Sequence, residues 1–95
     1  MITHIVFFKL KDSSEENTGK AAGVLRGLEG KVPELRSLEV GTDVIRGERS
    51  YDIALTARFD DLAGLEAYRV HPFHVEVAGY IKNESSAVAS VDYES

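Results

Sequence analysis

Short runs of β-branched and aromatic residues alternate along the chain with segments of helical periodicity. Such runs predict strands at residues 2–10 and 38–42. A clean two-residue alternation predicts a third strand, with one face made by Ile53, Leu55, Ala57 and Phe59. Residues 87–93 predict the last strand.

The first helix is predicted at residues 14–28, where Ser13 and Glu16 match a capping box. Its inward positions are small or apolar: Ala21, Ala22, Leu25 and Leu28. Glycine costs about 1 kcal/mol relative to alanine inside a helix, and the segment contains Gly19, Gly23 and Gly27. We therefore expect a weak helix and a mobile wall for any cavity beside it.

Pro72 divides the next helical region into two. A proline disfavours helical geometry at the residue before it and is favoured at the first position of a helix. One helix should therefore end near His71 and another should run from Pro72 to about residue 82. Asp60 or Asp61 should cap the earlier helix, which turns inward Leu62, Leu65 and Tyr68. The later helix carries an inward stripe made of His74, Val77, Ala78 and Ile81.

The order of elements is β-α-β-β-α-(α)-β, which is typical of an α+β, ferredoxin-like split βαβ fold in one domain, residues 1–95. Four strands should form one antiparallel sheet with the helices on one face. The other face should be polar in a monomer, yet it receives the apolar residues Ile5, Phe7, Val91 and Tyr93. We therefore expect a homodimer through this open face.

Composition excludes several classes of partner and site. The net charge of −5 argues against nucleic acid, and the scattered lysines and arginines form no membrane-binding patch. The chain has no cysteine, which excludes disulfides, thiolate zinc sites and cysteine nucleophiles. The apolar run at residues 5–8 is too short for a signal peptide or a transmembrane helix, so a cytoplasmic protein is expected.

Tyr68 and His74 are the candidate catalytic residues, because both are predicted to point into the apolar interior. An imidazole with a pKa of about 6.5 suits a general base at neutral pH, and a phenol can donate a hydrogen bond to an enolate oxygen. The alternative is that both are core residues held for packing. The predicted binding residues around them are His4, Val6, Phe8, Leu55, Val77 and Val88.

The remaining histidine and polar motifs are expected to be structural. His71 is interpreted as a helix-terminus residue. A metal site is not expected, because Pro72 interrupts the spacing of His71 and His74 and no carboxylate has ligand spacing beside them. Arg46 to Arg49 is interpreted as a solvated loop, although it could close over an acidic ligand. No cofactor is expected.

Three segments together resemble the stress-responsive α/β-barrel domain (Dabb) family, and the resemblance spans the whole chain. They are the opening THIVFFKLK at residues 3–11, the Tyr68…His71-Pro72-Phe73-His74 element, and the closing VDY at residues 91–93. The resemblance implies protomers that pair sheet to sheet into a dimeric α/β barrel. One plant branch acts as a polyketide cyclase, whose catalytic pair would fall on Tyr68 and His74 and whose pocket histidine on His4.

Other members of that family are stress-induced proteins with no established reaction. This chain has Ala21, Ala22 and Leu25 where the cyclase has aromatic residues, and no histidine in the third strand, which argues against the same substrate. Residues characteristic of the related dimeric-barrel monooxygenases are not evident.

Two function classes follow. The chain is either a small-molecule protein with cofactor-free acid–base chemistry on a small apolar carbonyl compound, or a non-catalytic stress-associated dimer with structural histidines. A cavity of a few hundred cubic ångströms touching His74 and Tyr68 would favour the first class, and a solid core the second.

Overall fold

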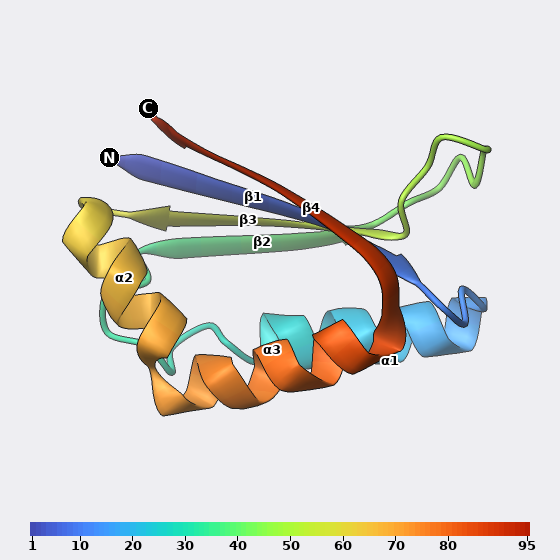
Figure 1. The fold of residues 1–95 in the computed structure, drawn as a ribbon, viewed down its shortest axis with the longest axis horizontal. Coiled ribbons are helices and arrows are strands. Elements are labelled where there is room, and N and C mark those ends of the chain that lie inside the picture. Colours follow the sequence, from blue (N-terminus) through green and yellow to red (C-terminus); the bar gives the residue numbers. More distant parts are fainter.

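A computed structural model describes all 95 residues and shows one four-stranded antiparallel sheet with three helices on one of its faces (Figure 1). The strand order is β2-β3-β1-β4, which is the ferredoxin-like α+β arrangement expected from the element order. The elements are β1 (Ile2–Leu10), α1 (Glu15–Arg26), β2 (Ser37–Thr42), β3 (Ile53–Phe59), α2 (Leu62–Val70), α3 (Pro72–Glu84) and β4 (Ser85–Glu94).

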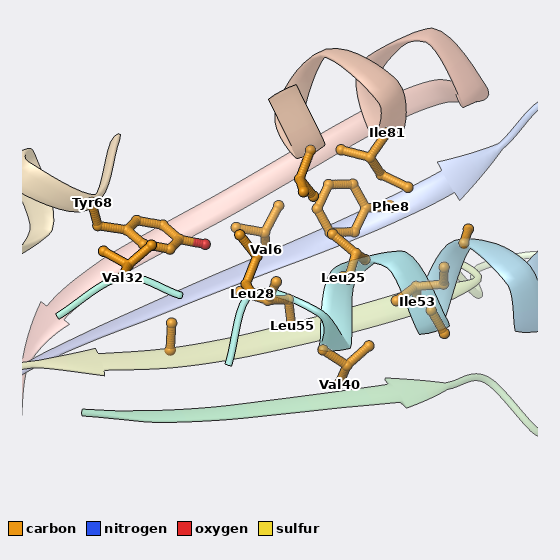
Figure 2. Close-up of a cluster of buried hydrophobic side chains, with 14 of the residues drawn as sticks. Val6, Phe8, Leu25, Leu28, Val32, Val40, Ile53, Leu55, Tyr68 and Ile81 are labelled. Carbon is orange, nitrogen blue, oxygen red and sulfur yellow. The ribbon is translucent and has the colours of Figure 1, made fainter. Parts of the chain in front are cut away.

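The core lies between the sheet and the helices, and the two-residue alternation of β1 and β3 creates its floor (Figure 2). Val6 pairs with Leu55 and Phe8 pairs with Ile53, so their side chains share the helix-covered face. Leu25 of α1 and Leu28 after it are buried against that floor.

The helix caps follow local hydrogen bonding. Ser14, not Ser13, is the N-cap of α1, because its Oγ accepts the backbone N–H of Asn17 at 3.2 Å. Asp12 fixes this register, since its carboxylate accepts the N–H of Ser14 at 3.1 Å. Asp61 caps α2 by accepting the N–H of Gly64 at 2.9 Å.

Pro72 separates α2 from α3 as predicted. His71 has an extended backbone (φ −63°, ψ 132°), and its Nδ1 accepts the N–H of Phe73 at 3.1 Å. His71 is therefore the N-cap of α3, which confirms its interpretation as a helix-terminus residue. Leu62 was wrongly predicted to point inward: it is the first residue of α2 and is exposed.

The face of the sheet opposite the helices is uncovered (Figure 1). It is also partly apolar. Ile5 pairs with Val91 and Thr3 pairs with Tyr93, so these side chains share it with Phe7. Val91 is 61% exposed, and Phe7 and Tyr93 are also exposed. We call this surface the open face. None of the three helices is both long and apolar enough to cross a membrane.

Candidate functional site

A cavity of about 130 Å³ lies between the sheet, α1, α2 and α3. Three polar residues line it, His4 of β1, Tyr68 of α2 and His74 of α3. The rest of the lining is apolar: Val6, Phe8, Leu25, Leu28, Leu55, Val77, Ala78 and Ile81. The structure thus brings together all but one of the residues predicted to form the site.

His74 has one nitrogen engaged and one free. Its Nδ1 lies 3.2 Å from the carbonyl oxygen of Arg69, and because a carbonyl only accepts, Nδ1 carries the proton. Nε2 therefore holds a lone pair. Burial lowers the pKa of His74 below its ordinary value of 6.5, against the opposing effect of the Arg69 hydrogen bond, so the ring is neutral at pH 7.

Tyr68 is 1% exposed and lies between three rings. Ring centroids are 4.2 Å apart for Tyr68 and His74, 4.9 Å for Tyr68 and Phe59, and 6.2 Å for Tyr68 and His4. In Figure 2 the Tyr68 hydroxyl points toward Val6 and Leu28 at the cavity. Burial raises the pKa of Tyr68 to about 12, so its phenol remains a hydrogen-bond donor at neutral pH.

Asp92 completes the site, although the sequence alone did not predict a functional role for it. His4 and Asp92 are direct partners across β1 and β4, and the Nδ1 of His4 donates a hydrogen bond to the Asp92 carboxylate. The alternation of β4 places Asp92 on the His4 face, but only the strand register shows that the two are opposite.

Val88 was wrongly placed in the pocket. It shares the helix-covered side of the sheet with Phe8, its pairing partner, yet it is 51% exposed and does not line the cavity. The reason is that β4 is an edge strand, whereas the cavity lies over the neighbouring strands β1 and β3.

The cavity is also smaller than the few hundred cubic ångströms that would favour a small-molecule protein over a non-catalytic dimer. Leu25 of α1 and Leu28 after it form the wall of the cavity on this side. Ala21 is fully buried elsewhere in the core, and Gly19 and Gly23 face open space. The two leucines, and not the alanines and glycines of α1, therefore limit the cavity on this side.

The other polar groups do not form a metal site or join the cavity. No three histidine, aspartate or glutamate side chains come together as a metal site requires. Arg46 to Arg49 lie in an exposed loop, as predicted. Within it, the Arg46 guanidinium donates to the carbonyl of Ser13 and lies 4.0 Å from the Asp52 carboxylate.

Comparisons with known proteins agree with this fold. The model of the stress responsive A/B barrel domain matches residues 2–95. No curated protein matches the chain in sequence.

Solved structures of the same fold come from bacteria and plants. A dimeric ferredoxin-like protein of unknown function from Bacteroides fragilis is 31% identical, with 99% of this chain and 95% of that chain covered and a TM-score of 0.84. A dimeric ferredoxin-like protein of unknown function from Thermobifida fusca is 26% identical, with 99% and 90% covered and a TM-score of 0.86. A hydroxynitrile lyase from Passiflora edulis is 21% identical, with 97% and 90% covered and a TM-score of 0.82.

Proposed function

The chain belongs to the stress-responsive A/B barrel domain family, and on that premise we propose that it is a homodimer that binds a small apolar carbonyl compound in the cavity and performs acid–base chemistry on it without a cofactor. One observation carries the proposal. The unprotonated Nε2 of His74 and the phenol of Tyr68 belong to rings 4.2 Å apart at one cavity, whose lining is apolar apart from these two residues and His4.

The proposed reaction begins with proton removal next to the carbonyl group. The Nε2 of His74 takes the proton from the α-carbon, and the bonding electrons move to the carbonyl oxygen. Tyr68 donates a hydrogen bond to the enolate oxygen that forms, which a buried donor stabilises more strongly than water does. The imidazolium of His74 then returns the proton to the enolate carbon. If that carbon has instead attacked a second carbonyl carbon of the ligand, the proton goes to the alkoxide oxygen that this attack creates. His4, whose Nδ1 proton is held by Asp92, would form a hydrogen bond with a ligand hydroxyl through its Nε2.

The cavity restricts the proposed ligand. Pockets for drug-sized molecules are about 300–1,000 Å³, whereas this cavity measures about 130 Å³. A compact carbonyl compound, such as a short β-keto thioester, would fill it. The Passiflora edulis protein of the same fold is a hydroxynitrile lyase, which supports the idea that this fold can house an enzyme site.

We place the partner on the open face. Phe7, Val91 and Tyr93 are exposed there, and burial of a large apolar side chain contributes about 1.5–3 kcal/mol. The Bacteroides fragilis and Thermobifida fusca relatives are dimeric, which supports a second copy as the occupant.

The test is a turnover screen of small carbonyl compounds and β-keto thioester mimics. We expect His74→Gln to lower kcat/KM by about 10²–10⁴-fold, because general acid–base catalysis contributes that much. Tyr68→Phe should cost less, and Tyr80→Phe is its matched control, since Tyr80 packs against the core but does not line the cavity. Equal rates in wild type and His74→Gln would remove His74 from any catalytic role.

The small cavity also favours a second candidate, a non-catalytic stress-associated dimer whose histidines are structural. This candidate predicts a lower melting temperature for His74→Gln and no turnover by the wild type on any compound of the screen.

A further inference from the structure

A single residue, His71, joins α2 to α3. Its backbone is extended (ψ 132°), whereas Val70 before it ends α2 and Pro72 after it begins α3. The two candidate catalytic residues lie on opposite sides of this junction, Tyr68 on α2 and His74 on α3, with their ring centroids 4.2 Å apart. The placement of one ring against the other therefore depends on the conformation at His71.

Hydrogen bonds from its backbone and its side chain hold His71 in place. Its N–H donates to the carbonyl oxygen of Tyr68 at 3.2 Å, and its carbonyl oxygen accepts the N–H of Val75 at 2.9 Å. Its Nδ1 accepts the N–H of Phe73 at 3.1 Å. Phe73 and Val75 are the two chain neighbours of His74. His71 therefore links α2 directly to the turn that carries His74.

The imidazole of His71 supplies the side-chain part of this link. The first N–H groups of a helix have no partner inside it, and a capping side chain can accept them. The first residue of α3 is Pro72, which has no N–H, so the imidazole accepts the first N–H that the helix offers, that of Phe73. Without the imidazole, the first turn of α3 would lose its side-chain cap.

The bond that orients His74 crosses the same junction. The Nδ1 of His74 donates to the carbonyl oxygen of Arg69 at 3.2 Å, from the first turn of α3 back to α2. Such a bond decides which ring nitrogen of a histidine carries the proton. If the first turn of α3 frays, this bond is lost and the proton is no longer confined to Nδ1.

We infer that His71 is a positioning residue: its imidazole holds the first turn of α3 and thereby keeps the Nδ1 of His74 on the Arg69 carbonyl and the lone pair on Nε2. This inference rests on the proposed function, which gives His74 the role of the base. His71 itself does not line the cavity, so it acts only through His74. A cap that served helix stability alone would leave the His74 ring unchanged on its removal.

Nitrogen NMR of the histidine side chains tests this inference without a substrate. At pH 8, above the ordinary histidine pKa of about 6.5, His74 should give one protonated and one unprotonated ring-nitrogen signal, which are assigned by their loss in His74→Gln. We expect the two signals to move toward each other in His71→Ala and to stay apart in His71→Asn, because an asparagine oxygen also caps a helix. Ser14→Ala is the matched control, since it removes the cap of α1 and should leave the His74 signals unchanged.

Turnover gives a second measurement on any substrate that the screen of carbonyl compounds finds. We expect His71→Ala to lower kcat by about 10²-fold, because a misplacement of about 1 Å can cost that much. His71→Asn should restore most of the rate.

Unchanged His74 signals in a folded His71→Ala, or an equal movement in Ser14→Ala, would overturn the inference and leave His71 as a helix cap. Signals that also converge in His71→Asn would overturn it, because a cap at this position would then not be what holds His74. If His71→Ala does not fold, His71→Gly gives the same test, since glycine is tolerated at an N-cap. Signals that follow the cap while no compound is turned over would support the positioning role and contradict the proposed function alone.

Discussion

Burial acts on Tyr68 and His74 in opposite directions, and both shifts favour the neutral side chain. Removal from water disfavours the phenolate and so raises the pKa of Tyr68 to about 12. The same effect disfavours the imidazolium and so lowers the pKa of His74. At neutral pH the pair therefore consists of one proton donor and one proton acceptor, as an acid–base site requires.

The lowered pKa of His74 predicts a pH dependence of stability. The unfolded chain takes up the histidine proton near pH 6.5, before the folded chain does. The contribution of His74 to stability is therefore complete above about pH 6.5 and is lost as the pH falls through the lowered pKa. Urea unfolding from pH 8 to pH 5 should show a steeper loss for wild type than for His74→Gln.

His4 and His71 are present in both proteins of that comparison, which therefore differ at His74 alone. Parallel curves for wild type and His74→Gln would contradict a lowered pKa of His74. A loss of stability confined to pH values above 7 would contradict its sign.

At the scale of the element, α1 combines a well-capped start with two glycines in its interior that do not serve packing. A β-carbon added at Gly19 or Gly23 would meet no atom within 4 Å. The conformational freedom of these glycines is therefore a cost to the helix without a gain elsewhere.

Gly23→Ala should stabilise the protein. The expected gain in the free energy of unfolding is about 0.5–1 kcal/mol, because alanine loses less backbone entropy in a helix. Thermal unfolding should show a rise of a few degrees. Gly30→Ala is the matched control and should destabilise, because Gly30 has a φ of +80°, which alanine adopts only with strain. A destabilised Gly23→Ala would show that α1 packs against a surface absent from the protomer.

At the scale of the whole molecule, β4 is the least covered element. It pairs with β1 alone, and both of its faces are largely exposed in the protomer. The same strand carries Asp92 to the candidate site and Val91 to the open face. The proposed dimer interface and the candidate site therefore share one strand.

Val91→Glu should separate the dimer and leave the protomer folded. A glutamate at this position is solvated in the monomer, since Val91 is 61% exposed, but would be an unpaired charge in an apolar interface. Light scattering at micromolar concentration should then report a monomer. Val88→Glu is the matched control, because Val88 is similarly exposed on the opposite face of β4. A dimer that persists in Val91→Glu would show that the open face is not the interface.

The sequence by itself determined the order of elements, the two faces of the sheet and the break at Pro72. Each rests on local chemistry: a period of two or of 3.6 residues, and the restricted backbone of proline. The same local reasoning placed Tyr68 and His74 on inward faces, and the family resemblance singled them out. It erred by one residue at the α1 cap, where both Ser13 and Ser14 can act and the Asp12 carboxylate decides.

The tertiary structure decided the shape and the completeness of the site. The pairing of His4 with Asp92 depends on the register of β1 and β4, which are joined only after 74 intervening residues. The exposure of Val88 depends on the position of β4 at the edge of the sheet, and the small cavity depends on how Leu25 and Leu28 pack. These features arise from contacts between distant segments, and periodicity within a segment carries no information about them.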